Sequence, residues 1–284
     1  MRIKQIVDSI SAVRGVRAIA LGGSQSRGEA DVHSDFDIGV YYDADALDEA
    51  GLARRLKELD DGRRDGLLNP PGQWGPWVNG GAWLTVGGTA VDVLLRDIRR
   101  VESVLRDCVA GKITVDYQAG HPFGFVNTIY AAETHYAKPL WQDPSLELDR
   151  LKALLHAKGE YPPLMKTATV RKFLWEAWFS LACGRKSAMK GDAHYAMGSV
   201  FRAAASWVQV LYALNERYLM NEKGALKRIE GLKLKPDDME SKVNFIYGAM
   251  ADGDGVTAYW LLEGLHGEVE ALCGEIETIR TFIR

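Results

Sequence analysis

The chain has 284 residues, of which 47% are hydrophobic and 26% charged, and its formal net charge at pH 7 is −3. This length and composition are typical of a globular protein with a substantial core and exclude a disordered chain. Because the chain has no global positive field, we expect no binding of a long nucleic acid through its phosphates.

The lack of a recognisable secretory signal or membrane-spanning segment, together with the cysteine usage, favours a cytoplasmic protein. The opening MRIKQIVDSI lacks the apolar core of a secretory signal, and no apolar run reaches the length of about 18 residues that spans a bilayer, so we expect no membrane contact. The cysteines are spaced too widely for a zinc site, and their odd number does not suit a disulfide framework. They are Cys108, Cys183 and Cys273. We expect them to be buried thiols.

The first part of the chain predicts two helices and two strands. Apolar residues at helical spacing predict a helix over 3–13. The apolar and β-branched segments 16–21 and 35–42 predict strands. The amphipathic segment 45–62 predicts a further helix, with Asp45 as its N-cap.

A loop and a hairpin follow. Residues 69–81 are rich in proline and glycine and contain Trp74 and Trp77, which either contact a substrate or cover the core. Segments 82–86 and 89–95 are joined by Gly-Gly, which predicts a two-residue hairpin turn.

The rest of the chain is mainly helical in pattern. Asp97 is the predicted N-cap of a helix that ends near Gly111, and 113–118 predicts one more short strand. From about residue 125 the periodicity is helical, and Trp175, Trp178 and Trp207 at helical spacing are expected in a bundle core. The order predicts an α+β fold, with a mixed sheet and flanking helices over 1–122 and an all-helical bundle domain over 123–284.

Three acidic residues interrupt these apolar strands. Asp35 and Asp37 project from the same face of one strand, and Asp92 lies between two valines of the hairpin. Taken alone, the Asp35 and Asp37 pair would also fit the solvent face of an edge strand. If the two strands are neighbours, however, the three carboxylates converge and need a cation between them. Oxygen ligands of this kind suit Mg²⁺.

A glycine-rich turn precedes the acids. Gly22 and Gly23 allow backbone N–H groups to approach an anion, Ser24 adds a hydroxyl donor and Arg27 adds a guanidinium suited to phosphate. No Lys-Ser/Thr pair follows the glycines, so the turn is not a P-loop.

The combined pattern resembles the nucleotidyltransferase superfamily that includes DNA polymerase β. It consists of Gly-Gly-Ser at 22–24, Arg-Gly at 27–28, Ser-Asp-Phe-Asp at 34–37 and the distal Asp92. Within the superfamily it is most similar to the small-molecule enzymes that adenylylate aminoglycoside or lincosamide antibiotics. The motif resemblance covers roughly residues 16–95.

The resemblance implies a role for each matching residue. Asp35 and Asp37 would hold two Mg²⁺ ions, and Asp92 would bind one of them and accept the proton of the attacking hydroxyl. Glu133 is the alternative general base. The residues expected to hold the nucleotide lie in the turn and in the helical half. They are Gly22, Gly23, Ser24, Arg27, Ser34, Tyr218 and Lys223.

The function implied is transfer of AMP from ATP to a hydroxyl of a small molecule, with an antibiotic as the leading acceptor. Nothing in the sequence selects the base, identifies the acceptor or decides whether the chain forms a homodimer. Three alternatives stay open: a protein-modifying adenylyltransferase such as an antitoxin, an RNA-tailing enzyme, and a non-catalytic nucleotide-binding module. The acidic balance disfavours RNA, and the presence of all three acids disfavours a silent module.

Overall fold

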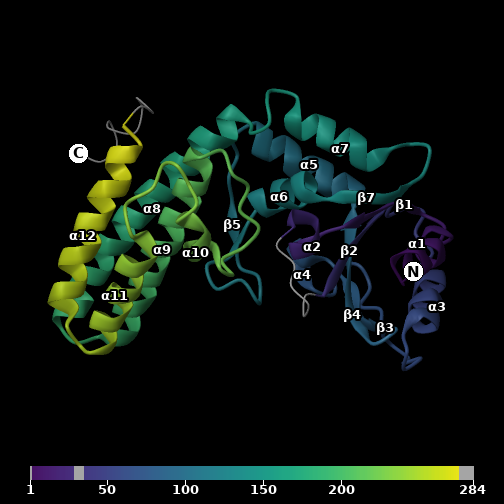
Figure 1. Cartoon of the computed structure of the whole chain (residues 1–284), viewed down its shortest axis with the longest axis horizontal. Helices are drawn as coiled ribbons and strands as arrows, with labels where there is room; N and C mark the ends of the chain where they lie inside the picture. Colours follow the sequence, from purple (N-terminus) through teal and green to yellow (C-terminus); the bar gives the residue numbers. More distant parts are fainter. Residues whose placement is uncertain (1, 29–34, 275–284) are drawn as a thin grey trace. The chain divides into compact units, whose positions relative to one another are not determined.

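The computed structural model describes residues 2–28 and 35–274, and its internal contacts divide the chain into two compact units (Figure 1). The first unit contains Met1–Asp107, Asp116–Gly120 and Tyr130–Ala157. The second contains Cys108–Val115, His121–Ile129 and Lys158–Arg284. A mixed sheet belongs to the first unit and a set of long helices to the second, which confirms the predicted α+β fold.

The sheet of the first unit has the strand order β3-β4-β2-β1-β7. Its strands are β1 (Val16–Leu21), β2 (Phe36–Tyr42), β3 (Gly81–Val86), β4 (Thr89–Asp97) and β7 (Lys138–Gln142). β2 and β4 are parallel, and the other neighbouring pairs are antiparallel. Gly87 and Gly88 join β3 to β4 with positive φ angles of 56° and 74°, so the predicted hairpin is confirmed.

One face of the sheet carries the apolar core. Strand alternation turns Ile38 and Val93 toward this face, where both are fully buried. Helices α1 (Arg2–Ser11) and α3 (Glu49–Leu59) cover it (Figure 1). Leu52 of α3 is fully buried in the same core cluster as the strand residues. The opposite face carries Asp37, Asp92 and Arg96 together with buried apolar side chains such as Ala18 and Tyr41.

Three shorter helices contact side chains of that opposite face. They are α2 (Gly23–Arg27), α4 (Gly75–Val78) and α6 (Thr128–Tyr136), of which α2 forms within the glycine-rich turn.

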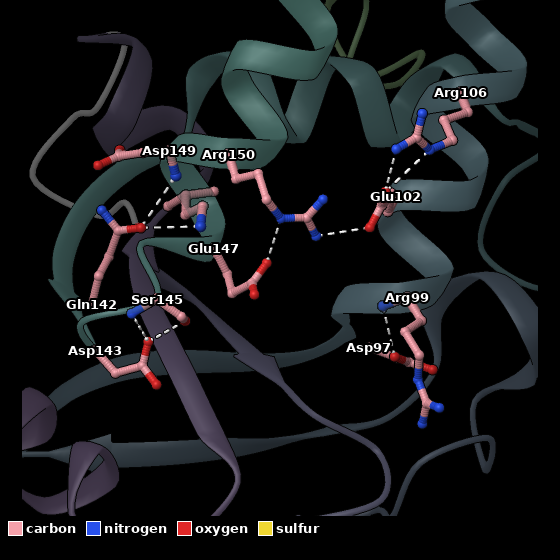
Figure 2. A network of polar contacts seen from close by, with 11 residues as sticks. Asp97, Arg99, Glu102, Arg106, Gln142, Asp143, Ser145, Glu147, Asp149 and Arg150 are labelled. Atoms are coloured by element: carbon pink, nitrogen blue, oxygen red, sulfur yellow. Dashed lines mark hydrogen bonds and ion pairs between the residues drawn. The ribbon is translucent and has the colours of Figure 1, made fainter.

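An ion-pair network joins α5 (Ile98–Val109) to α7 (Glu147–His156) (Figure 2). Arg150 lies between two carboxylates, with Nη2 at 2.7 Å from Glu102 and Nε at 2.8 Å from Glu147. Arg106 contacts Glu102 at 2.6 Å. Hydrogen bonds from Arg150 and Arg106 lower the pKa of Glu102 to about 2. The network fixes α7 beside α5 within the first unit.

No strand is predicted beyond residue 118, but residues 138–142, around a break in the helical pattern at Pro139, form the edge strand β7, which pairs with β1. Pro139 is tolerated there because an edge strand has a side with no ladder partner. The segment is too short for periodicity to distinguish a strand from a helix. The strand predicted over 113–118 shrinks to β5 (Val115–Asp116), which pairs with β6 (Phe125–Val126).

The predicted N-cap of α3 is also wrong. Asp48 caps this helix, because its side chain accepts a hydrogen bond of 2.9 Å from the Gly51 N–H. Asp45 instead pairs with Arg99 at 2.9 Å. Asp97 does accept a hydrogen bond of 3.0 Å from the Arg99 N–H at the start of α5, as expected of a cap.

The second unit is built on the long helices α8 (Pro163–Met189) and α9 (Ala193–Leu214). The others are α10 (Ala225–Ile229), α11 (Met239–Ala251) and α12 (Gly255–Leu272). Trp207 is fully buried and donates to Nδ1 of His266 at 3.1 Å. Trp175 and Trp178 are instead 47% and 38% exposed on α8, so their prediction as core residues is wrong. No helix within 2–28 or 35–274 is long and apolar enough to cross a membrane.

Candidate functional site

Two of the predicted acids lie side by side on the face of the sheet opposite Ile38 and Val93. Asp37 of β2 and Asp92 of β4 are register partners on adjacent parallel strands. Residues paired in register project to the same face, while their neighbours Ile38 and Val93 enter the core on the other. The condition on which the sequence prediction depended, that the two strands are neighbours, is therefore met.

The electrostatic state of Asp37 shows that the acids act on one another. Burial raises the pKa of the Asp37 carboxyl, and the charges of Asp92 and Asp35 raise it further, to about 6, against a lowering effect of Arg27. Asp35 itself is exposed and immediately precedes β2. An excess of negative charge thus gathers around a partly buried carboxylate, which a bound cation would relieve.

The glycine-rich turn packs directly against Asp37. The Gly22 N–H donates to the Asp37 carbonyl at 2.8 Å, and Gly23 begins α2 with a φ of +59°. A Cβ at Gly23 would overlap the Asp37 carboxylate, so only glycine lets the two approach. Ser24 and Arg27 follow within the same short helix. Ser34 lies outside the described residues.

Glu133, the alternative base, is engaged by a buried arginine that the sequence patterns did not single out. Arg96 stands on the face of Asp92, four residues along β4, and its Nε and Nη2 each donate to Glu133 of α6 at 2.7 Å. Its Nη1 donates to the carbonyls of Val78 and Leu95. Burial opposes the charge of Arg96, but the Glu133 carboxylate beside it raises the pKa of the guanidinium overall. Both Glu133 oxygens are therefore occupied. An arginine within a buried strand was the signal for this pair.

Two tryptophans lie on the β3 side of the acids, away from the glycine-rich turn. Trp83 of β3 is the register partner of Asp92, is 59% exposed, and stacks on Trp74 with ring centroids 4.5 Å apart. Trp77 is buried edge-on against Tyr130, so it belongs to the core. Of the two tryptophans in the predicted loop, only Trp74 remains near the acids, and Trp83 was not singled out from the sequence.

The residues expected from the helical half lie in the second unit. Tyr218 is buried there, and its hydroxyl donates to the Glu160 carbonyl at 2.7 Å. Lys223 is exposed, and its carbonyl accepts a hydrogen bond from Arg228. The Tyr218 hydroxyl thus has a protein partner, and the role of Lys223 stays a prediction.

The acids fit a Mg²⁺ ion that completes its shell with other oxygens. Within the described parts of the chain, no group of three or more His, Cys, Asp and Glu side chains is placed to hold a metal. Mg²⁺ is commonly held by one or two carboxylates, with waters and substrate phosphates as the remaining ligands. Asp37 and Asp92 provide such a pair. The raised pKa of Asp37 reflects burial and the negative charges around it, which a bound cation would neutralise.

A family model and a solved structure are similar to this chain. Residues 1–70 match the model of a family described as the nucleotidyltransferase domain, a segment that includes Gly22 to Asp37 but stops short of Asp92. A solved structure of a nucleotidyltransferase-like protein from Exiguobacterium sibiricum aligns with 100% of this chain and 80% of its own, at 11% identity and a TM-score of 0.46. No curated protein matches the chain. The N-terminal part of this chain is thus similar to nucleotidyltransferase domains, which supports nucleotide transfer in general.

Proposed function

We propose that this protein is a Mg²⁺-dependent adenylyltransferase that moves AMP from ATP to a hydroxyl of a small molecule. The observation that carries the proposal is the in-register pair Asp37 and Asp92, with the Gly22–Arg27 turn packed against Asp37. The family match includes the turn and Asp37, and Asp92 is the register partner of Asp37 on the neighbouring strand.

The chain's own groups account for the binding of the nucleotide. Backbone N–H groups and the Ser24 hydroxyl in the turn would donate to the β- and γ-phosphates, and Arg27 would balance the charge that develops on the leaving pyrophosphate. Asp35, Asp37 and Asp92 would hold Mg²⁺. When bound, the ion supplies Lewis-acid stabilisation of the charge on the transferring phosphoryl group.

The same groups account for the transfer step. The acceptor oxygen forms a bond to the α-phosphorus while the bond from that phosphorus to the bridging oxygen of the β-phosphate breaks, and pyrophosphate leaves. The acceptor proton must go to a base. Glu133 is bound through both oxygens to Arg96, so Asp92 is the carboxylate on this face that we assign to accept it. The antibiotic acceptor class comes from the sequence resemblance.

Transfer of label tests the proposal. ATP labelled at the α-phosphate, with Mg²⁺, is incubated separately with aminoglycosides, lincosamides, RNA and a protein lysate. We expect label on a small molecule and release of pyrophosphate, both abolished in Asp92→Asn. The matched control is Asp97→Asn on the same strand, because asparagine preserves the cap of α5. Transfer that survives Asp92→Asn would contradict the assignment, and label on RNA or protein would identify one of the alternatives.

A further inference from the structure

The stacked pair Trp74 and Trp83 is an open aromatic surface beside the acids. Trp83 of β3 is the register partner of Asp92 of β4, and Asp92 is in turn the register partner of Asp37 of β2, so the three side chains project from the same face of the sheet. The Trp83 side chain is 59% exposed, and the indole of Trp74 lies 4.5 Å away at an interplanar angle of 29°. A large apolar ring is thus kept accessible in the row that holds both carboxylates.

The surrounding backbone holds this pair in place. Trp74 donates its N–H to the Asn79 carbonyl at 2.9 Å, and its carbonyl accepts a hydrogen bond of 3.0 Å from the Gln118 side chain. A Cβ at Gly81 would come within 2.0 Å of the Val93 carbonyl oxygen and within 2.8 Å of the Trp74 indole carbon Cζ3. The absence of a side chain at this strand position leaves room for the Trp74 indole, so the aromatic surface is preorganised.

The position of the tryptophan pair relative to the glycine-rich turn indicates which reactant the pair would contact. Across the strands the row runs from the turn after β1, through Asp37 and Asp92, to Trp83 on β3. In an in-line displacement the attacking and leaving oxygens lie on opposite sides of phosphorus. If the leaving phosphates occupy the turn, the attacking group approaches from the side of Trp83.

We infer that Trp74 and Trp83 form the acceptor subsite and that the acceptor is a neutral or cationic compound with a rigid ring, a sugar or an aromatic, carrying the reacting hydroxyl. This inference rests on the proposed function and names its substrate class. Indole faces bind the faces of rings, and they attract cations through the ring quadrupole.

Binding measurements without turnover test the subsite. Kanamycin and lincomycin serve as ring probes and sorbitol as an acyclic polyol, each titrated by calorimetry into protein holding Mg²⁺ and a non-hydrolysable ATP analogue. The variants are Trp83→Ala and Trp83→Phe. Trp260→Ala is the matched control, since Trp260 is an exposed tryptophan of α12 in the other unit. Loss of the stacked-indole signal in circular dichroism on Trp83→Ala confirms that the pair exists in solution.

We expect Trp83→Ala to weaken the binding of at least one ring probe by about tenfold, and Trp83→Phe to stay within about threefold of the unmodified protein. Sorbitol should discriminate none of the variants, and all of them should bind the ATP analogue equally. The inference is overturned if no ring probe binds, if Trp83→Ala matches Trp260→Ala, or if Trp83→Ala loses the nucleotide. Failure of the unmodified protein to bind the ATP analogue would instead overturn the proposed function.

Discussion

Replacing Asp37 by asparagine should stabilise the fold while it removes the proposed activity. The carboxyl is partly buried among like charges, and its pKa rises from 3.8 to about 6. That shift of about two units corresponds to about 3 kcal/mol of unfolding free energy, which ionisation of Asp37 costs the folded state at neutral pH. The amide of the Asp37→Asn variant carries no charge at any of these pH values and avoids this cost.

The sign of the effect defines a pH window. Because the folded protein binds the Asp37 proton more tightly than the unfolded chain, the contribution favours folding below about pH 4 and is lost as the pH rises to about 6. Urea unfolding with a chelator present should therefore show Asp37→Asn to be more stable than the unmodified protein at pH 8 and equal to it at pH 3.5. Added Mg²⁺ should stabilise only the unmodified protein.

Asp60→Asn is the matched control, with the opposite sign. The Asp60 side chain is fully buried, but it accepts hydrogen bonds from Arg64 and from the Thr85 N–H, and these partners lower its pKa. The Asp60→Asn substitution should therefore destabilise the protein at pH 8, by about 1–3 kcal/mol. If Asp37→Asn gives no gain at pH 8, the carboxylate is not electrostatically strained and the argument for a cation at this position fails.

Two further predictions concern the surroundings of Asp37. Gly23→Ala should abolish the thermal shift caused by Mg²⁺ and ATP. Gly28→Ala should keep it, because Gly28 has a similar positive φ but no atom of the described residues lies within 4 Å of the Cβ that alanine would add. Equal shifts in both variants would refute the close approach. Glu133→Gln leaves the buried Arg96 charge uncompensated and should cost about 3–5 kcal/mol in urea unfolding, and a loss under about 1 kcal/mol would show that the pair is not buried as described.

Elements with local signals were predictable from the sequence. The first strand is found over the expected residues 16–21, and the Gly-Gly turn forms the expected hairpin. Both depend on side chains a few positions apart, which the sequence displays directly. Element boundaries are less well determined by the sequence. The glycine-rich turn contains the short helix α2, and α3 is capped by Asp48 and not by the predicted Asp45, since several residues near a helix end can act as its cap.

Features that depend on distant neighbours were not predictable. The parallel pairing of β2 with β4 brings Asp37 to Asp92 and could be stated only as a condition. Periodicity places Trp175 and Trp178 on a helix but does not say which face is packed, and here Trp175 stacks on Phe179 at the surface. Likewise, Arg96 within an apolar strand signals a buried partner, but nothing in the sequence identifies Glu133 as that partner.

The late return of the chain to its first unit has a consequence for synthesis and for fragments. Residues 130–157 complete a structure that begins at the N-terminus, so the sheet stays one strand short until residue 142 has left the ribosome. A fragment ending at residue 122 would leave the edge of β1 open to intermolecular pairing. It would also lack Glu133 and so leave the buried Arg96 guanidinium without its carboxylate partner. Expression of the sheet-containing part by itself should therefore extend at least to residue 157.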